Sequence, residues 1–312
     1  MRLRSQTAPA APQYACRKLL PLCMRAVSRG RIDVYGCWDF SRENAISCVL
    51  LAHEDTRGAN DMSPRRALVR EPGKKFTKCL SCHPLRHTVN LQKAKLQHAA
   101  YRRALTELGL EVITLEPDDE HADACFVEDN AVVHGGRALI CRMGAESRRD
   151  EVGSVEGRLK HYVKVRRARE PATLEGGDVV HFPNRLISGL SQRTNEEGIH
   201  QMSEWLQIRV DAIEDPKIMH LKSYLTALDE NRVLASERFA GHPLLKGLEV
   251  ITVPVEEAYA ADSLSVGGTV ILPAGMPRSA ALLRSAGFDV LHLDVSEFQK
   301  CDGAVTCLSI LF

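Results

Sequence analysis

The sequence predicts an α/β fold in which five similar units close into a ring. Residues 109–115 (GLEVITL) are nearly repeated at residues 247–253 (GLEVITV), and weaker copies of this strand occur at residues 162–165, 207–210 and 288–293. The copies begin about 40 to 53 residues apart, a period typical of repeated supersecondary units. Short β-branched runs alternate with polar helical segments between them, which indicates an α/β fold.

Each unit continues in the same order after this strand. A second strand is expected at residues 125–133, 172–180, 219–227, 261–266 and 304–311. A third is expected in four units, at residues 137–141, 185–188, 232–235 and 269–272. Candidate helices fit between the strands at residues 91–108, 149–161, 195–206 and 278–286, and the first of them has one approximately apolar face.

The fifth unit lacks a third strand, and residues 67–70 (ALVR) form a strand without a partner in their own unit. We expect this N-terminal strand to complete the fifth unit. Such closure makes a ring and protects the strand edges, as in propellers.

Residues 1–61 differ in composition from the rest. Up to Arg31 they carry seven basic residues and no acidic one. An Arg-rich, acid-free leader is also typical of an organellar transit peptide. We favour an N-terminal extension, disordered or not part of the fold, followed by a single catalytic domain at residues 62–312 that begins at Met62.

Composition narrows the class of function. Lys and Arg total 41 against 40 Asp and Glu, so no broad basic face for nucleic acid or anionic lipid is expected. No apolar run approaches the about 18 residues that a membrane helix needs. The ten cysteines are scattered, without a secretory signal pattern, which favours a reducing cytosol. We expect a cytoplasmic protein with a small-molecule partner, no nucleic acid and no membrane.

Reactive residue types recur at equivalent points of the expected second strands. The first unit carries Glu128 and Asp129, the second Glu175, the third His220 and the fifth Cys307. Taken singly, each has an ordinary explanation, since cysteine is among the most buried residue types and a lone histidine is usually part of the core. Their agreement in position across four units instead predicts that they converge at the centre of the ring.

Together these residues suit chemistry on a guanidinium group. Glu128 and Asp129 could hold the planar cation, because carboxylates match its N–H donors in pairs. Cys307 would attack the guanidinium carbon, since a nearby cation favours the thiolate. His220 would give the leaving amine its proton and Glu175 would orient that histidine. The scheme uses no metal and no cofactor.

At these residues the sequence resembles the dimethylarginine dimethylaminohydrolases, a family of the guanidine-modifying superfamily. The resemblance runs from about Ala67 to Phe312. It is carried by CFVEDN (125–130), ESRR (146–149), LEGGD (174–178), GLSQRTN (189–195), HLKS (220–223) and DGAVTCLS (302–309).

The resemblance implies a five-fold pseudo-symmetric ββαβ propeller of the pentein type. It implies hydrolysis of N-methylated arginine to citrulline and a methylamine, through a covalent thiouronium on Cys307. Arg148 and Arg193 would hold the substrate's α-carboxylate, with Asp123 near its α-amino group. A homodimer is a further expectation. Asp262 departs from the family pattern, which has Asn at this position, and we assign it no role.

Two alternatives stay open. Arginine deiminases have His-x-Asp where this chain has His220-Leu221-Lys222, so the missing carboxylate favours methylated arginine over arginine itself. In a different class of function, residues 79–83 (CLSCH) match the CxxCH signature of haem attachment, or could bind a metal through Cys79 and Cys82. The resemblance instead places this segment in a mobile lid over the active site.

Overall fold

The computed structural model describes residues 64–312. The expectations for residues 1–61 and for a domain start at Met62 lie outside the described residues. None of the described helices is long and apolar enough to cross a membrane.

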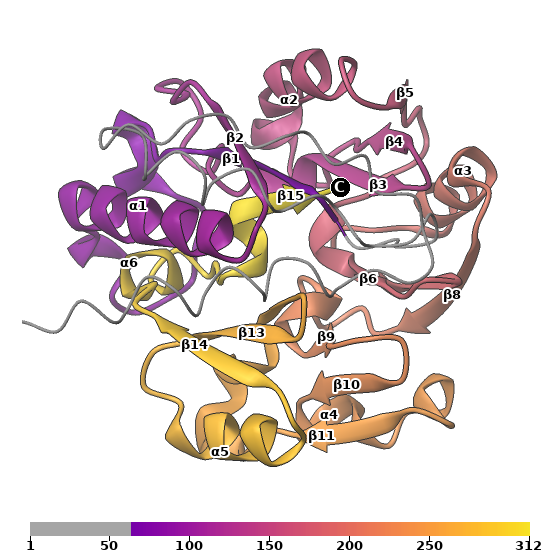
Figure 1. Ribbon diagram of the computed structural model, residues 1–312. Coiled ribbons are helices and arrows are strands. Elements are labelled where there is room, and N and C mark those ends of the chain that lie inside the picture. The colour runs from indigo at the N-terminus through magenta and orange to yellow at the C-terminus, as the bar shows by residue number, and fades with distance from the viewer. Residues whose placement is uncertain (1–63) are drawn as a thin grey trace, which may run out of the picture. The chain divides into compact units, whose positions relative to one another are not determined.

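Five three-stranded sheets of the same construction make up a five-fold pseudo-symmetric ββαβ propeller (Figure 1). In each sheet the central strand pairs antiparallel with one neighbour and parallel with the other. A helix connects the two parallel strands, as such a crossover requires. The predicted fold class is therefore confirmed.

Four sheets are built from consecutive strands. Their members are β3 (Ala131–His134), β4 (Arg137–Ile140) and β5 (Lys164–Arg167); β6 (Val179–His181), β7 (Arg185–Leu190) and β8 (Arg209–Glu214); β9 (Leu225–Ala227), β10 (Arg232–Ala235) and β11 (Glu249–Thr252); and β12 (Leu264–Val266), β13 (Thr269–Pro273) and β14 (Asp289–Leu293).

The fifth sheet joins strands from opposite ends of the described chain. Strand β1 (Arg66–Arg70) lies between β15 (Ser309–Leu311) and β2 (Glu111–Leu115). Ala67 pairs antiparallel with Leu311 and parallel with Val112. The expected closure by the N-terminal strand is confirmed, and it anchors the segment that carries Cys307.

The longer helices lie close to their predicted positions. They are α1 (Leu91–Glu107), α2 (Val152–Leu159), α3 (Glu196–Leu206) and α5 (Pro277–Ser285). The side chains of Asn90 and Asn195 accept hydrogen bonds from the first turns of α1 and α3, which defines where these helices begin. Two short helices, α4 (Glu237–Ala240) and α6 (Ser296–Gln299), were not predicted, because four residues are too few to show a helical period.

The predicted second strands begin several residues before the observed ones. In each unit the strand is preceded by a 3₁₀ turn: η4 (Val127–Asn130), η6 (Gly176–Asp178), η7 (Leu221–Ser223), η9 (Val255–Ala261) and η10 (Thr306–Leu308). Short apolar runs do not distinguish a buried strand from a buried turn, which explains the error. The reactive side chains lie on or beside these turns, not on the strands.

Candidate active site

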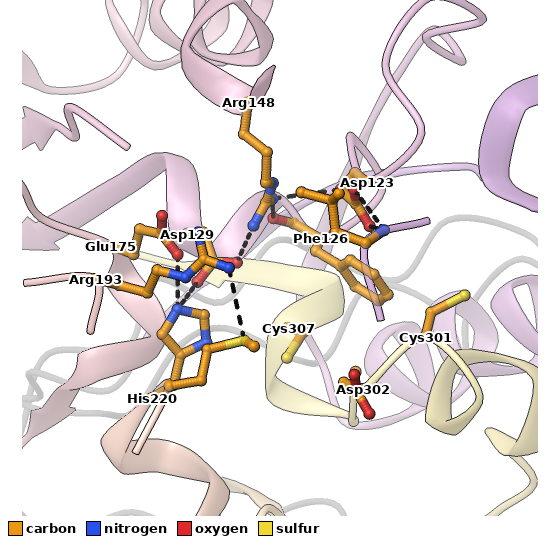
Figure 2. Close-up of a pocket in the computed structure, with 13 residues that line it drawn as sticks. Asp123, Phe126, Asp129, Arg148, Glu175, Arg193, His220, Cys301, Asp302 and Cys307 are labelled. Atoms are coloured by element: carbon orange, nitrogen blue, oxygen red, sulfur yellow. Dashed lines mark hydrogen bonds and ion pairs between the residues drawn. The ribbon is translucent and has the colours of Figure 1, made fainter. Parts of the chain in front are cut away.

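A pocket is lined by seven of the eight site residues predicted from sequence (Figure 2). These seven are Asp123, Asp129, Arg148, Glu175, Arg193, His220 and Cys307. The eighth, Glu128, does not line it. Residues that come from four different units of the ring thus converge on one cavity.

His220 and Glu175 form a direct pair in the pocket. Nε2 of His220 lies 2.7 Å from Oε2 of Glu175 and 3.7 Å from Oδ1 of Asp129. Burial alone would lower the pKa of His220, but the charge of Asp129 and the hydrogen bond to Glu175 outweigh it and raise the pKa to about 9. The imidazole is therefore protonated at neutral pH, as a proton donor must be.

The Gly-Gly pair after Glu175 makes this approach possible. A Cβ on Gly176 would lie 2.0 Å from the carbonyl oxygen of Glu128. A Cβ on Gly177 would lie 2.7 Å from Oδ1 of Asp129 and 2.8 Å from Nδ1 of His220. Any side chain at these two positions would therefore separate the turns that carry the reactive groups.

Glu175 is fully buried and is held by the backbone. Its Oε1 accepts a hydrogen bond from the amide of Gly144 at 2.9 Å, while Oε2 faces His220. Both oxygens of this carboxylate are thus directed, which sets the orientation of the imidazole.

Asp129 is kept as a carboxylate by its neighbours. Its Oδ2 lies 2.7 Å from Nη1 of Arg148, and its Oδ1 accepts from the amide of Gly177 at 3.0 Å. Burial would raise its pKa, yet the charges of His220 and Arg148 hold the pKa below its usual value.

The two predicted arginines differ in their surroundings. Arg148 is 6% exposed and also pairs with Glu151, at 3.0 Å between Nη2 and Oε2. The guanidinium of Arg193 lies 4.0 Å from Sδ of Met219 and forms no salt bridge with any of the described residues. Arg193 is therefore the more available cation in the pocket.

Asp123 lies where the predicted lid segment meets the pocket. Its Oδ1 and Oδ2 accept from the amide of Leu80 at 3.2 and 3.1 Å. Burial raises the pKa of this carboxyl despite the charge of Arg148.

The thiol of Cys307 is neutral without substrate. Burial raises its pKa well above the usual range, and the charges of Asp262, Glu128 and Asp129 raise it further. A cation bound beside the thiol would lower the pKa again, because it stabilises the thiolate.

Glu128 differs from expectation. Its Oε1 lies 2.6 Å from Nζ of Lys222 and its Oε2 lies 2.9 Å from Oγ1 of Thr306. These contacts occupy both oxygens, so the structure does not bring Glu128 to the guanidinium side of the pocket. Neighbours in a 3₁₀ turn project in different directions, which separates Glu128 from Asp129.

Sequence reasoning did not single out Thr306 and assigned no role to Asp262, yet both residues join this interior group. Oγ1 of Thr306 lies 2.9 Å from Oδ1 of Asp262. The repeat carried a usable signal, since Asp262 directly follows the 3₁₀ turn η9 of the fourth unit, the unit that had offered no reactive residue.

Asp129, Glu175 and His220 offer ligand atoms that lie within 4.8 Å of one another, a spacing suited to a metal ion. Their carboxylate oxygens already accept bonds from Arg148, Gly144 and Gly177 or face His220. An ion would have to displace these donors, and the cluster is satisfied as an acid–base group.

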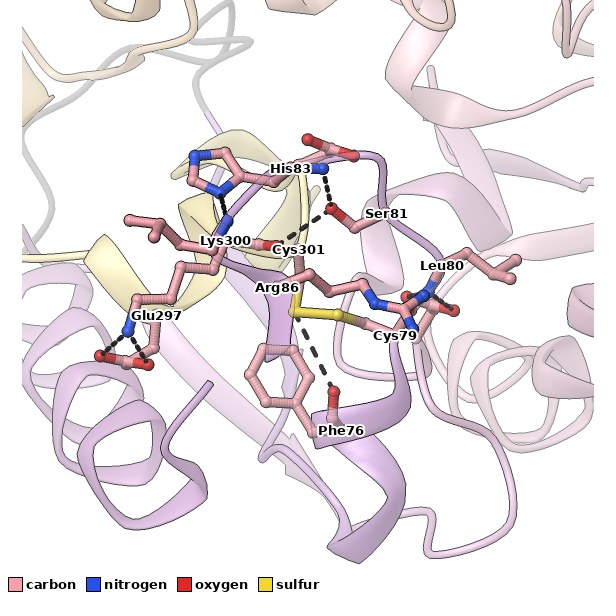
Figure 3. The surroundings of a disulfide bond; sticks show 12 residues. Phe76, Cys79, Leu80, Ser81, His83, Arg86, Glu297, Lys300 and Cys301 are labelled. Carbon is pink, nitrogen blue, oxygen red and sulfur yellow. Dashed lines mark hydrogen bonds and ion pairs between the residues drawn. A yellow bond between two sulfur atoms is a disulfide. The ribbon is translucent and has the colours of Figure 1, made fainter. Parts of the chain in front are cut away.

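The CxxCH motif contains one half of a disulfide (Figure 3). Cys79 is bonded to Cys301, 222 residues away, with 5.8 Å between the Cα atoms. Cys82 is a free, exposed cysteine. Haem attachment or metal binding through the motif needs both thiols, so the structure contradicts that alternative. The bond also weighs against a reducing cytosol, and the cytoplasmic location stays a prediction.

Around this disulfide, residues 79–82 are fastened to the chain that leads to Cys307. Oγ of Ser81 donates to the carbonyl of Lys300 at 3.0 Å, and the amide of Cys82 donates to Oδ2 of Asp302 at 2.8 Å. This segment is therefore held beside the pocket, which Leu80 helps to line.

Comparisons with known proteins agree with one another. A family model described as N,N dimethylarginine dimethylhydrolase, eukaryotic, matches residues 75–234. The N(G),N(G)-dimethylarginine dimethylaminohydrolase of Pseudomonas aeruginosa is 37% identical over 225 residues, covering 70% of this chain and 89% of the relative. That of Streptomyces coelicolor is 37% identical over 257 residues, covering 80% and 97%.

A solved structure extends this likeness to three dimensions. A mutant of the DDAH from P. aeruginosa complexed with citrulline is similar with a TM-score of 0.78 and 34% sequence identity. The match covers 80% of this chain and 100% of that chain.

Proposed function

Because this chain belongs to the dimethylarginine dimethylaminohydrolase family, hydrolases of amidine C–N bonds, we propose that it hydrolyses N-methylated arginine to citrulline and a methylamine. The observation that carries the proposal is the hydrogen-bonded pair of His220 and Glu175 in one pocket with the thiol of Cys307. Citrulline bound by the P. aeruginosa relative supports the product.

Substrate would bind with its two charged ends at different parts of the pocket. Asp129 is the carboxylate available to the guanidinium, and it keeps its charge. Arg193 and Arg148 would hold the α-carboxylate. Asp123, beside the backbone of Leu80, would receive the α-amino group. This assignment keeps the predicted roles except that of Glu128, which Lys222 already neutralises.

The bound cation starts the reaction. It lowers the pKa of Cys307, so the thiol loses its proton to solvent, and the thiolate attacks the guanidinium carbon and forms a C–S bond. His220 donates its proton to the substituted nitrogen, the C–N bond breaks, and the methylamine leaves. A thiouronium remains on Cys307.

The second half of the reaction reverses these roles. The now neutral His220 takes a proton from water, which attacks the same carbon. The added hydroxyl loses its remaining proton to solvent as the C–S bond breaks, which regenerates the thiolate of Cys307 and releases the ureido group of citrulline. Glu175 stays paired with the imidazole throughout and keeps its orientation.

Selectivity for methylated substrates follows from the lack of a carboxylate at position 222, where this chain has a lysine. A carboxylate at this position would favour an unsubstituted nitrogen and would be left unpaired by a dimethylated one. Lys222 instead points at Glu128, 2.6 Å away, and does not line the pocket. A site built to hydrogen-bond a polar group of its substrate rejects an analogue that lacks this group by a factor of about 10⁴. The lack of a carboxylate at position 222 should therefore remove a large penalty against methylated substrates.

The test is citrulline release from arginine, monomethylarginine and asymmetric dimethylarginine under identical conditions, with the released amine identified. We expect the methylated substrates to give the higher kcat/KM, with methylamine or dimethylamine as co-product. The Cys307→Ser variant, prepared in parallel, reports background. Equal or better turnover of arginine, with ammonia released, would make this protein an arginine deiminase.

A further inference from the structure

Behind Cys307, the hydroxyl of Thr306 lies between two carboxyl groups. Its Oγ1 is 2.9 Å from Oε2 of Glu128 and 2.9 Å from Oδ1 of Asp262. All three side chains are buried, Asp262 at 4% exposure. Thr306 immediately precedes Cys307 in the 3₁₀ turn η10.

Two hydrogen bonds between this hydroxyl and the two carboxyl groups need one additional proton. A hydroxyl has one hydrogen to donate and two lone pairs that accept. It can donate to one carboxylate only, so the second 2.9 Å contact is a hydrogen bond only if that carboxyl is protonated and donates to Oγ1. Two ionised carboxylates on one hydroxyl would leave a buried contact unsatisfied.

The surroundings place the proton on Asp262. Glu128 has a cation, since Nζ of Lys222 lies 2.6 Å from its Oε1. No ion pair joins Asp262 to a cation among the described residues. Burial and the charge of Glu128 raise the pKa of Asp262 to about 7, although hydrogen bonds from Thr306 and the charge of Lys222 oppose this.

We propose that Asp262 is a positioning residue of the hydrolysis inferred above. In its protonated form it donates to Thr306, holds the turn that carries Cys307, and leaves one negative charge behind the thiol in place of two. When it ionises, that hydrogen bond is lost and the Cys307 thiolate becomes less favourable. The part that concerns turnover rests on the proposed function.

The other groups that face this cluster do not supply a competing charge. The hydroxyl of Tyr259 donates to the carbonyl of Gly303 at 2.7 Å, and that of Tyr101 bonds Oγ of Ser309 at 2.7 Å. Burial raises the pKa of both phenols, so they stay neutral. The charges that remain are those of Glu128 and Lys222, with Asp129 acting on Cys307 from the pocket side.

The order in which Asp262 and Cys307 titrate determines the direction in which a substitution of Asp262 shifts the thiol pKa. The thiol of Cys307 titrates well above its usual pKa, where Asp262 is already ionised. A neutral amide at position 262 keeps a donor for Thr306 and removes that charge. Asp262→Asn should therefore lower the pKa of the thiol by about one unit, as expected for removing a neighbouring like charge.

The experiment titrates the Cys307 thiolate by its ultraviolet absorbance in full-length protein. Each titration is corrected by subtracting the matching protein that also carries Cys307→Ser. We expect Asp262→Asn and Asp262→Ala to shift the half-point down by about one unit. Glu257→Gln is the matched control, because Glu257 is a buried acid on the same turn η9 that bonds the amides of Arg278 and Ser279 instead. It should leave the half-point in place.

The pH profile of kcat separates positioning from simple structural support. Wild type should lose activity as the pH rises through about 7, the pKa of Asp262. Asp262→Asn should lack this loss, and Asp262→Ala should lack it too but at a lower plateau, since it has no donor for Thr306.

Thiolate half-points that coincide in wild type, Asp262→Asn and Asp262→Ala would overturn the proposal. If Asp262→Asn does not fold, Asp262→Ala alone decides, by the same criterion. A shifted half-point in a protein that turns over no arginine derivative would support the link between Asp262 and Cys307 while refuting the proposed function.

Discussion

Two buried charged clusters flank Cys307, and they differ in which charges they stabilise. The front cluster, Asp129, Glu175 and His220, lines the pocket, and its two carboxylates keep a histidine protonated. The rear cluster, Glu128, Lys222, Thr306 and Asp262, does not line the pocket. There a lysine neutralises one acid, while burial and the charge of Glu128 favour protonation of the other.

One turn contributes a residue to each cluster. Glu128 and Asp129 are adjacent in η4, yet the first pairs with Lys222 and the second with Arg148. Charge that faces the pocket can respond to a substrate, whereas charge behind it has to be balanced by the protein itself, because buried unpaired ions are costly. We therefore expect the front cluster to govern turnover and the rear cluster to govern stability and thiol pKa.

Replacing the nucleophile between the clusters should have the largest effect on turnover. Cys307→Ser changes the volume little, but a hydroxyl is a far weaker nucleophile at neutral pH. We expect citrulline release to fall by more than about 10³-fold while the melting temperature stays near that of wild type. Turnover within about tenfold of wild type would remove Cys307 from its proposed role.

Breaking the front cluster should have the next largest effect. Glu175→Gln removes a carboxylate that raises the pKa of His220, so that pKa should fall from about 9 toward its usual value. We expect kcat to drop by about 100-fold, a typical cost for impaired proton transfer. An NMR titration of the imidazole gives the direct reading, and an unchanged His220 pKa would contradict the pairing.

The same pair predicts how stability depends on pH. The pKa of His220 is raised on folding, so its contribution is fully present below the unfolded value of about 6.5 and is lost as the pH rises through about 9. Wild type should therefore lose more stability than Glu175→Gln over this interval, measured by urea unfolding at each pH.

Breaking the rear cluster should affect stability more than turnover. Lys222→Met leaves the charge of Glu128 buried without its cation, which typically costs about 3–5 kcal/mol in the free energy of unfolding. Adding Glu128→Gln should recover most of this loss, because the uncompensated charge is gone. Loss of turnover as complete as in Cys307→Ser, at unchanged stability, would place Lys222 in the chemistry and erase the distinction between the clusters.

The rim of the pocket offers the mildest test for turnover. The Cys79–Cys301 disulfide closes a separation of 222 residues, and removing such a bond costs about 2–5 kcal/mol. We expect the Cys79→Ser, Cys301→Ser double variant to unfold at lower urea, and wild type with reductant to behave alike. KM should rise more than kcat falls, since the freed segment carries Leu80 beside Asp123. Unfolding midpoints unaffected by reductant would show that this bond does not form.

The sequence by itself determined the architecture and most of the pocket. The near-identical strands at residues 109–115 and 247–253 revealed the repeat. Equivalent positions in a repeat converge when the repeat closes, so His220 and Cys307 could be brought together without coordinates. Periodicity and position survive in the linear chain, which is why these features were predictable.

Only the tertiary structure decided how the acids are divided. Glu128 could face either the pocket or Lys222. The outcome depends on side-chain directions in a 3₁₀ turn whose sequence pattern is also typical of a strand. The partner of Cys79 lies 222 residues away, and spacing does not specify such a pairing. The protonation of Asp262 likewise depends on burial and on one hydroxyl shared with Glu128, properties of packing in three dimensions that no local pattern records.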